Sequence, residues 1–304
     1  MTIVVAGYTG LVGSAIFNLL QLRNQDVIGI NSKVINLLDR NSTFEFINDV
    51  KPSLVIDSAA VVGGIGANSS YPVDFLSKNL QIQCNLMDAA HAADVERFVF
   101  LGSSCIYPRE CPQPIKEEYL LTGPLEATNS AYAVAKIAGI ELIKSYRKQY
   151  NRRWISLMPT NMYGPGDNFD LETSHVLPAF INRFVSARKS DAHLVTLWGT
   201  GKPRREFLHT NDLAEAVLLA ADKYDSDSHL NVGTGADLTI KELAELVAAK
   251  SGFEGIIEWD VSKPDGTPRK VLDISRLQAL GWKPKISLED GISETIRWFE
   301  SNLN

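Results

Sequence analysis

Short apolar runs alternate with longer segments in which apolar residues recur every three or four positions. The runs that are rich in Val and Ile and have the length of buried strands are TIVVAG, DVIGI, LVIDSAA, RFVFLGSS, WISLMPTNMYG and HLNVGTG. Helical periodicity fills most of the intervals between them. This alternation predicts an α/β fold with a Rossmann-type, doubly wound parallel sheet.

The alternation loosens beyond about residue 163. There the chain has a stretch rich in Gly, Pro and Asp (YGPGDNFDLETSH), a helical pattern (VLPAFINRFVSAR) and a basic segment (WGTGKPRREFLH). The segments TNDLAEAVLLAA and HLNVGTG then resume the earlier pattern, so we expect the chain to return to the first sheet. The sequence therefore predicts a first domain of residues 1–163 plus about 208–234. A smaller mixed α/β domain would hold about 164–207 plus 235–304.

Composition and charge limit the classes of function. The chain has 304 residues and a net charge of −6, which favours neither nucleic acid nor an anionic membrane surface as a partner. Its three cysteines lack the paired spacing of a zinc or redox motif, and the histidines lack ligand spacing, so we expect no metal. The N-terminus lacks a signal-peptide pattern, and no apolar run reaches the length of a membrane span. We expect a cytoplasmic protein.

A glycine-rich loop follows the first predicted strand directly and opens a helix. Gly7, Gly10 and Gly13 in GYTGLVGSAI would let backbone amides and the helix N-terminus face a pyrophosphate. Tight strand-to-helix turns also select glycine, but the position after the first strand favours a dinucleotide site. The first domain is thus predicted to bind a dinucleotide, and the smaller domain to bind the substrate.

The end of the second predicted strand bears on the choice of cofactor. An NAD site usually carries an acidic residue there, which holds the ribose hydroxyls. This chain reads GINSK instead, and Asn31, Ser32 and Lys33 offer donors and a positive charge. The pattern favours NADP over NAD, and the alternative is that Lys33 is a solvated loop lysine, which nothing nearby in the sequence excludes.

Tyr132 and Lys136 lie four residues apart in the helical pattern NSAYAVAKIAGIELIKSYRKQY and therefore share one face. A phenol needs a neighbouring positive charge to act as an acid or base at neutral pH, and Lys136 could supply it. Ser103 and Ser104 close the preceding predicted strand, at the edge where open α/β sheets bind ligands. An amphipathic helix can contain this spacing by chance, but its company favours a catalytic tyrosine.

Several motifs together resemble known families. GYTGLVG, LGSS and YAVAK are similar to the extended short-chain dehydrogenase/reductases. Within that group, NLLD, VGGIGAN, GSSCIYP, PTNMYGPGDNF, SHVLPA, REFLH, NVGTG and KPDGTPRK resemble, in order and along nearly the whole chain, the GDP-L-fucose synthase family. The resemblance implies an enzyme that epimerises and then reduces GDP-4-dehydro-6-deoxy-D-mannose with NADPH, and that forms a homodimer through helices near residues 76–92 and 131–149. That family often has an arginine after the first loop glycine, where this chain has Tyr8 and Thr9.

The resemblance also implies the site residues. Tyr132, Lys136 and Ser103 would serve the reduction, and Cys105 and His175 match the pair that epimerises the sugar. The implied cofactor residues are Gly7, Tyr8, Thr9, Gly10, Leu11, Val12, Gly13, Lys33, Leu101, Gly102, Ser103, Ser104, Lys136, Pro159, Thr160, Asn161, Met162 and His175. The implied substrate residues are Arg183, Trp198, Arg205, Asp265 and Lys270.

The thiol in GSSCIYP has a chemical rationale. Protons on both carbons beside a ketone are acidified, because the carbanion delocalises into the carbonyl, and inversion needs a base and an acid on opposite faces. A cysteine and a histidine have pKa values suited to these roles. Cys105 lies two residues past Ser103, so an extended strand end would project both side chains to the same side. Without the resemblance, Cys105 would read as a small buried apolar residue and His175 as a structural histidine.

Three alternatives remain open at this stage. A GDP-L-colitose synthase, which acts on a 3-deoxy sugar, would share the same scaffold and most motifs. A C4 epimerase or 4,6-dehydratase is disfavoured, since a dehydratase would need acidic residues where Cys105 and Ile106 stand. A non-catalytic dinucleotide sensor is compatible with the fold, but it would not need Tyr132 and Lys136.

Overall fold

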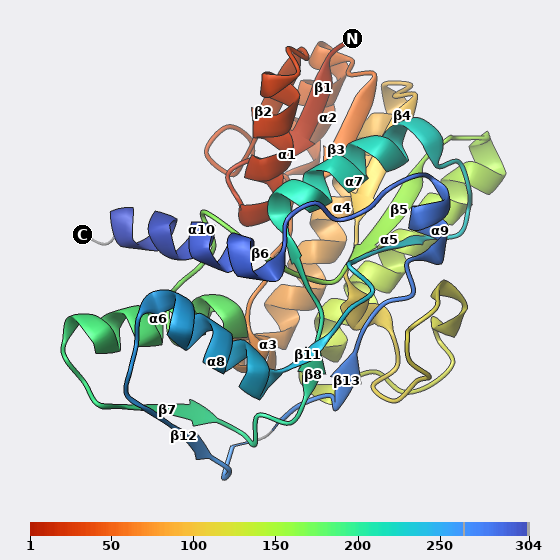
Figure 1. Ribbon diagram of the computed structural model, residues 1–304. Coiled ribbons are helices and arrows are strands. Elements are labelled where there is room, and N and C mark those ends of the chain that lie inside the picture. Colours follow the sequence, from red (N-terminus) through yellow and green to blue (C-terminus); the bar gives the residue numbers. More distant parts are fainter. Residues whose placement is uncertain (264, 303–304) are drawn as a thin grey trace.

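A six-stranded parallel sheet forms the centre of the computed structural model, which describes residues 1–263 and 265–302. Its strands lie in the order β2-β1-β3-β4-β5-β10 (Figure 1). Because β2 lies on one side of β1 and β3 on the other, the order of the strands reverses at β1. Ligands bind at such a switch point, beyond the carboxyl ends of the strands. The strands are β1 (Ile3–Ala6), β2 (Val27–Ile30), β3 (Leu54–Asp57), β4 (Arg97–Leu101), β5 (Ile155–Pro159) and β10 (Leu230–Val232).

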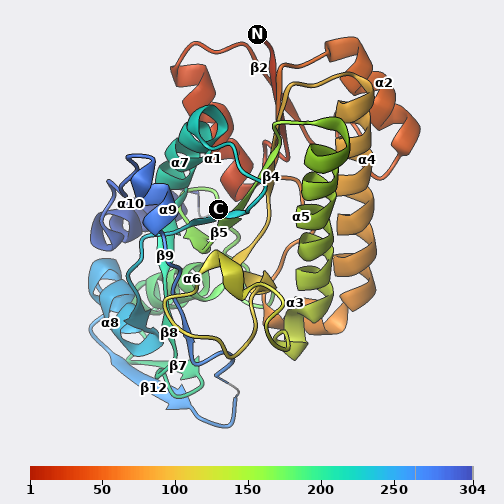
Figure 2. The same ribbon diagram turned by 90° about the vertical axis from the view of Figure 1, so that its right-hand side faces the viewer.

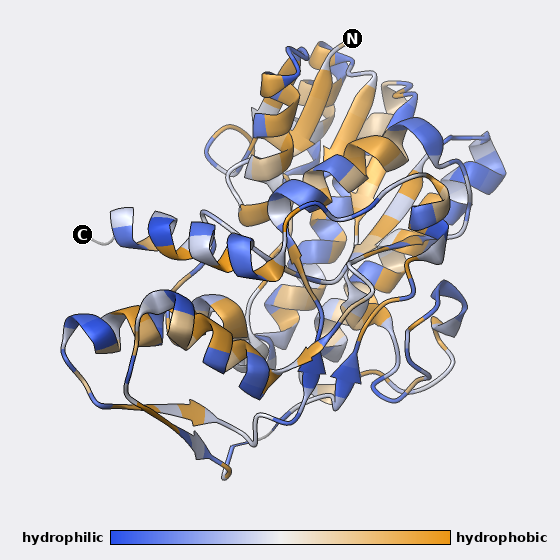
Figure 3. Cartoon of the chain, in the orientation of Figure 1, coloured by the Kyte–Doolittle hydropathy of each residue, from blue (hydrophilic) through white to orange (hydrophobic). Residues whose placement is uncertain are grey.

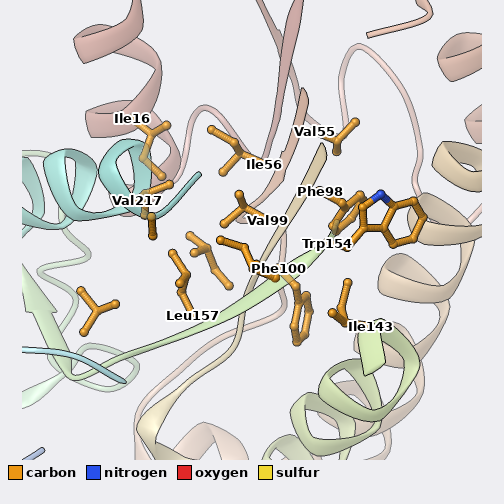
Figure 4. Packing of buried hydrophobic residues seen from close by; sticks show 14 of the residues in the cluster. Ile16, Val55, Ile56, Phe98, Val99, Phe100, Ile143, Trp154, Leu157 and Val217 are labelled. Carbon is orange, nitrogen blue, oxygen red and sulfur yellow. The ribbon is translucent and has the colours of Figure 1, made fainter. Parts of the chain in front are cut away.

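Helices cover both faces of this sheet. Figure 2 shows α1 and α7 on one side of the strands and α2, α4 and α5 on the other. Side chains from both layers meet the sheet in one apolar core, in which Ile16 of α1 and Val217 of α7 lie across the strands from Ile143 of α5 (Figure 4). The helices of these layers are α1 (Leu11–Leu22), α2 (Arg40–Val50), α4 (Asn79–Ala92), α5 (Ser130–Tyr150) and α7 (Thr210–Lys223).

A second apolar core lies among α6, α8 and α10, where Phe184, Leu243 and Ile292 are fully buried. These helices pack against the short strands β7, β9 and β11 rather than against the central sheet. Their apolar sides face one another, and their polar residues face outward (Figure 3). The elements of this part and its neighbourhood are β6 (Asn161–Tyr163), α6 (Val176–Lys189), β7 (Leu194–Trp198), β8 (Arg204–Arg205), β9 (Phe207–His209), β11 (Leu238–Thr239), α8 (Ile240–Ser251), β12 (Ile256–Asp260), β13 (Arg269–Lys270), α9 (Ser275–Ala279) and α10 (Leu288–Ser301).

Short helical turns complete the chain between the larger elements. They are α3 (Ile65–Ser70), the π-helical turn η1 (Asp74–Lys78), and the 3-10 turns η2 (Ser104–Ile106), η3 (Glu117–Tyr119) and η4 (Ala127–Asn129). The turn η2 follows β4 and carries Cys105, and η1 leads directly into α4.

The predicted α/β fold with a doubly wound parallel sheet is confirmed, and so is the return of HLNVGTG to the first sheet, as β10 beside β5. The run WISLMPTNMYG is two strands rather than the single strand that its apolar pattern predicts. Beyond Leu157, β5 has no β4 partner, and Pro159 lacks an amide donor, so the chain crosses over and β6 pairs with β9. The boundaries of the two predicted domains stay a prediction. No helix of the described ranges combines the length and apolarity that a membrane span requires.

Candidate active site

The glycine loop lies between β1 and α1 and is shaped by close backbone contacts. Gly7 has a φ of +79°, and a Cβ atom on Gly13 would stand 2.1 Å from the Gly7 carbonyl oxygen. Gly10 caps α1 without a side-chain hydrogen bond, so the first backbone amides of the helix, which include those of Leu11 and Val12, have no intrahelical acceptor. This cradle of free amides fits a pyrophosphate, as the glycine spacing predicts.

The loop rests on the end of β2. The ring of Tyr8 packs over Gly29, where a Cβ would come within 2.4 Å of the ring, and lies 5.1 Å from the ring of Phe17. Asn31 accepts hydrogen bonds from the backbone amides of Lys33 and Val34, and Lys33 is exposed. Tyr8 and Thr9 are therefore seated beside the position where the ribose end of a dinucleotide would reach, next to an exposed cation.

Lys136 is buried, with 3% of its surface exposed, and donates a 2.9 Å hydrogen bond to the Leu101 carbonyl at the end of β4. Its Nζ lies 4.7 Å from the centre of the Phe100 ring and 6.0 Å from that of Tyr132. Burial lowers the pKa of Lys136 to about 8, and the charge of Asp57 opposes this shift. The helix thus brings Tyr132 and Lys136 to the carboxyl edge of the sheet.

The Tyr132 phenol keeps its proton at neutral pH. Burial raises its pKa well above the usual range, the charge of Cys105 adds to the rise, and a hydrogen bond with Ser103 partly opposes it. The sequence predicts that Lys136 stabilises the phenolate, whereas the structure places Nζ on the Leu101 carbonyl. Tyr132 is therefore arranged to donate a proton rather than to hold a negative charge.

Ser103 and Cys105 come together through the turn η2 after β4. Ser103 is the N-cap of this turn, and the Ser103 hydroxyl accepts a hydrogen bond of 3.2 Å from the Cys105 amide. The strand is not extended through Cys105, as the sequence suggested, because the 3-10 turn begins at Ser104. The turn still leaves the Ser103 hydroxyl and the Cys105 thiol next to the same phenol, since both influence the pKa of Tyr132.

Lys270 of β13 lies against Cys105, with 3.5 Å between Nζ and Sγ. Burial by itself would raise the pKa of the Cys105 thiol, but Lys270, Ser103 and Arg205 outweigh it and hold that pKa below its usual range. Arg205 faces Lys270 across the register of β8 and β13. The thiol is thus easier to ionise than an ordinary cysteine, as suits a base.

His175 caps the N-terminus of α6 and is accessible to solvent. Its pKa is lowered, first because many protein atoms surround the ring and then because of the positive charge of Lys270. Lys270 therefore acts on both members of the predicted acid–base pair. The loop before His175 packs closely against Gly64, whose amide donates a hydrogen bond to the Thr173 carbonyl. A Cβ atom added at Gly64 would stand 2.8 Å from the Ser174 carbonyl oxygen.

The remaining predicted cofactor residues lie at the same sheet edge. Gly102 follows β4 and its amide bonds the Leu157 carbonyl at 2.8 Å. Thr160 joins β5 to β6, which begins at Asn161, and the Asn161 side chain donates to the Glu206 carbonyl at 2.8 Å. Leu101 ends β4 and Ser104 begins η2, and Pro159 and Met162 lie at the end of β5 and within β6.

Three predicted substrate residues are not among those that line the pocket at Cys105. Trp198 ends β7, is 64% exposed, and stacks with the Lys263 ammonium 5.4 Å from the ring centre. The Asp265 carboxylate accepts hydrogen bonds from the amide and the hydroxyl of Thr200, each at 2.7 Å. Its negative charge partly opposes the fall that burial causes in the pKa of Arg205. Arg183 lies two turns along α6 from His175 and takes part in no ion pair within residues 1–263 and 265–302.

Sequence reasoning missed part of this site. A pocket beside Cys105 and Lys270 is also lined by Arg109, Glu126, Asn129 and Arg269. Arg109 and Glu126 form an ion pair of 3.4 Å, and the buried Asn129 Oδ1 has no hydrogen-bond partner in the described part of the chain. The sequence does hold one indication that these arginines belong to the site, which is their position beside residues already predicted for it. Arg109 directly follows GSSCIYP, and Arg269 directly precedes Lys270.

Comparison with known proteins agrees with this geometry. The sequence profile of the NAD dependent epimerase/dehydratase family matches residues 3–233. The chain belongs to this family. One relative, the probable GDP-L-fucose synthase 1 of Oryza sativa subsp. japonica, is 52% identical over 301 residues, which cover 98% of this chain and 92% of the relative. Another, GDP-L-fucose synthase 1 of Arabidopsis thaliana, is 51% identical over 302 residues, or 99% and 94% of the two chains.

A solved structure has the same architecture. The GDP-L-fucose synthetase of Naegleria fowleri bound to NADP superimposes with a TM-score of 0.91 at 28% identity, over 99% of this chain and 94% of that chain. The resemblance to GDP-L-fucose synthases is thereby confirmed along nearly the full length. As a member of an NAD dependent epimerase/dehydratase family, this chain is an enzyme whose amide cradle at α1 is the place for a nicotinamide dinucleotide.

Proposed function

We propose that this protein converts GDP-4-dehydro-6-deoxy-D-mannose to GDP-L-fucose, by epimerisation at C3 and C5 followed by reduction of the C4 ketone. The observation that carries the proposal is that an ionisable thiol held by Lys270 and a protonated phenol share the Ser103 hydroxyl as a neighbour. One ketone can therefore meet both groups. The two plant relatives named above carry the name GDP-L-fucose synthase and match this chain along nearly its full length, which supports the same reaction.

Epimerisation uses Cys105 and His175. The Cys105 thiolate removes the proton from a carbon beside the ketone, and the electron pair of the broken C–H bond moves into the carbonyl as an enolate. His175 then returns a proton to that carbon from the other face, which inverts it. Lys270, with its ammonium 3.5 Å from the sulfur, stabilises the thiolate before the step.

Reduction uses Tyr132, Ser103 and Lys136. When bound, the reduced nicotinamide supplies the hydride to the carbonyl carbon. The Ser103 hydroxyl holds the carbonyl oxygen, and Tyr132 donates its phenolic proton to that oxygen as the alkoxide forms. Lys136 provides the positive charge behind the tyrosine.

Basic residues around the thiol suit the nucleoside diphosphate. Arg205 and Lys270 lie side by side on β8 and β13, and guanidinium groups bind pyrophosphate oxygens in pairs. Arg183, Trp198 and Asp265 would complete the binding of the nucleotide, with the exposed indole of Trp198 offering a face to a base. These assignments rest on the family motifs together with the placement of each residue.

NADPH is the preferred cofactor in this proposal. The end of β2 carries Asn31 and the exposed Lys33, which suit a ribose 2′-phosphate, and no carboxylate stands among residues 31–34. The enzyme would work as a homodimer through α4 and α5. These helices lie together on the outer face of the sheet (Figure 2), where Val134 and Tyr150 of α5 are 46% and 48% exposed.

The test is to incubate purified protein with GDP-4-dehydro-6-deoxy-D-mannose and either NADPH or NADH, and to identify the sugar by NMR. We expect GDP-L-fucose, formed faster with NADPH. The 3-deoxy analogue, the precursor of GDP-L-colitose, serves as the competing substrate and should be converted more slowly. An unchanged sugar, or a reduced sugar with its original configuration at C3 and C5, would overturn the proposal.

A further inference from the structure

A buried polar cluster lies under α5, and its members are not among the residues that line the pocket at Cys105. It consists of Asp57 at the end of β3, Gln83 on α4 and Lys136 on α5, whose surfaces are 0%, 2% and 3% exposed. Asp57 Oδ2 and Gln83 Oε1 are buried acceptors that have no hydrogen-bond partner among the described residues. Such atoms are costly inside a protein and call for an explanation.

Backbone register places the Asp57 carboxylate on the Lys136 side of the sheet. Asp57 stands opposite Phe100 in the parallel pair β3 and β4, and paired residues project to the same face. The Lys136 ammonium lies 4.7 Å from the centre of the Phe100 ring. The same ring packs against α5 at Gly139, where an added Cβ atom would stand 2.4 Å from it. Asp57 Oδ1 accepts the Ala59 amide at 3.1 Å, which leaves Oδ2 without a partner on this side.

Electrostatics couples the two buried charges. Burial lowers the pKa of Lys136 to about 8, and Asp57 is the charge that opposes the fall. Burial raises the pKa of Asp57 to about 6, and Lys136 opposes that rise. The other groups that face the cluster are neutral or act elsewhere: Gln83 from α4 carries no charge, Tyr132 on α5 is protonated, and Cys105 on η2 acts on Tyr132. At neutral pH the carboxylate therefore keeps the ammonium charged.

We propose that Asp57 is a positioning residue for the reduction, whose buried carboxylate keeps Lys136 cationic, seated on the Leu101 carbonyl and behind Tyr132. A neutral Lys136 would donate a weaker hydrogen bond to the Leu101 carbonyl and would lose the charge that favours proton transfer from the phenol. The inference rests on the proposed function only in taking ketone reduction as one readout. Asp57 acts through Lys136 and has no role in the epimerisation.

Three variants separate charge from shape. Asp57→Asn and Asp57→Ser remove the charge but keep an acceptor for the Ala59 amide, whereas Asp57→Glu keeps the charge. We expect the alkaline limb of kcat for reduction, with its midpoint near the Lys136 pKa of about 8 in the natural protein, to move down by about one pH unit in both neutral variants. At pH 7.5 that shift costs about threefold in rate. Asp57→Glu should keep the natural midpoint.

Epimerisation is the internal control. Deuterium uptake beside the ketone should keep its pH dependence in all three variants, because Lys270, Ser103 and Arg205, and not Asp57, act on the Cys105 thiol. A neutral variant with an unchanged alkaline limb for reduction would overturn the inference. A shift of equal size in Asp57→Glu would do so too, since a structural role of the side chain would then explain it.

A second measurement needs no turnover and uses a variant only for assignment. In protein labelled with 13C at the lysine ε-carbons, the Lys136 resonance should titrate near pH 8 and also respond to the protonation of Asp57 near pH 6. Lys136→Arg assigns the resonance. If that resonance shows no response near pH 6, Asp57 is not coupled to Lys136 and the inference fails, even where the enzyme reduces its sugar. If the natural protein reduces no sugar but the coupling is present, the proposed function fails alone.

Discussion

The ammonium of Lys270 lies 3.5 Å from the sulfur of Cys105, although the two residues are 165 positions apart in the chain. The contact joins the turn after β4 to the short strand β13, and it gives the thiol its low pKa against the opposing effect of burial. The acid–base chemistry at Cys105 therefore depends on a segment that sequence proximity does not connect to it.

Removing the Lys270 charge should make Cys105 less reactive. In Lys270→Met the thiol loses its nearest cation, so its pKa rises and iodoacetamide alkylates it about tenfold more slowly at pH 7. Peptide mapping by mass spectrometry distinguishes Cys105 from Cys84 and Cys111, whose pKa values are raised by burial. Lys250→Met, which removes a surface cation paired with Glu289, is the control. Equal alkylation rates in both variants would show that Lys270 does not set the thiol pKa.

Tyr132→Phe should separate the two half-reactions. Without the phenolic proton, oxidation of NADPH by the keto sugar should fall by about 10²–10⁴-fold. Exchange of the protons beside the ketone should continue, because Cys105 and Lys270 are untouched. Absorbance of the nicotinamide follows the first and NMR in deuterated water follows the second. A parallel loss of both activities would contradict separate roles for the phenol and the thiol.

Two alanine substitutions in the glycine loop should fail in different ways. A Cβ on Gly13 would stand 2.1 Å from the Gly7 carbonyl oxygen and 2.7 Å from the Ser58 hydroxyl, so Gly13→Ala should lower the free energy of unfolding by about 1–3 kcal/mol. A Cβ on Gly10 meets the same carbonyl at an acceptable 3.4 Å, so Gly10→Ala should fold normally and bind NADPH more weakly. Urea denaturation and fluorescence titration measure the two effects. A stable Gly13→Ala protein would contradict the close packing of the loop.

Asp167, in the loop after β6, should make the protein less stable as pH rises. Burial raises its pKa to about 7, against an unfolded value of about 4, so between these values the folded state holds a proton that the unfolded state has lost. Stability from this group is therefore present below pH 4 and is lost by pH 7. Asp167→Asn should raise the free energy of unfolding by up to about 4 kcal/mol at pH 8 and leave it unchanged at pH 4.

The matched control for that prediction lies three residues further along the loop. Asp170 is exposed, and hydrogen bonds from the Thr173 side chain and amide lower its pKa. Asp170→Asn should give no gain at pH 8. If urea denaturation shows the same change for both variants, the burial of Asp167 is not the cause.

Local patterns accounted for the sheet, the glycine loop and the Tyr132 helix. Each depends on residues within one or two elements: apolar runs define strands, and a spacing of four puts Tyr132 and Lys136 on one helix face. The capping box that Thr239 and Glu242 form at the start of α8 likewise depends on residues only three positions apart.

Contacts between distant segments could not be read in this way. Asp57 ends an apolar strand, and nothing in LVIDSAA reveals that its carboxylate shares a buried cluster with Lys136. Arg109 and Arg269 line the pocket beside Cys105 only because the loop after η2 and strand β13 fold against each other. Periodicity also joined β5 and β6 into one strand, because the crossover to β9 is decided by the partners available at the sheet edge.

The most direct test of the account follows deuterium into the sugar. Natural protein and Cys105→Ser are each incubated with GDP-4-dehydro-6-deoxy-D-mannose in deuterated water without NADPH, and NMR measures label at C3 and C5. We predict deuterium at both carbons with the natural protein, and a loss of about 10²-fold or more in its rate of uptake with Cys105→Ser. Undiminished uptake in Cys105→Ser would contradict the claim that this thiol is the base.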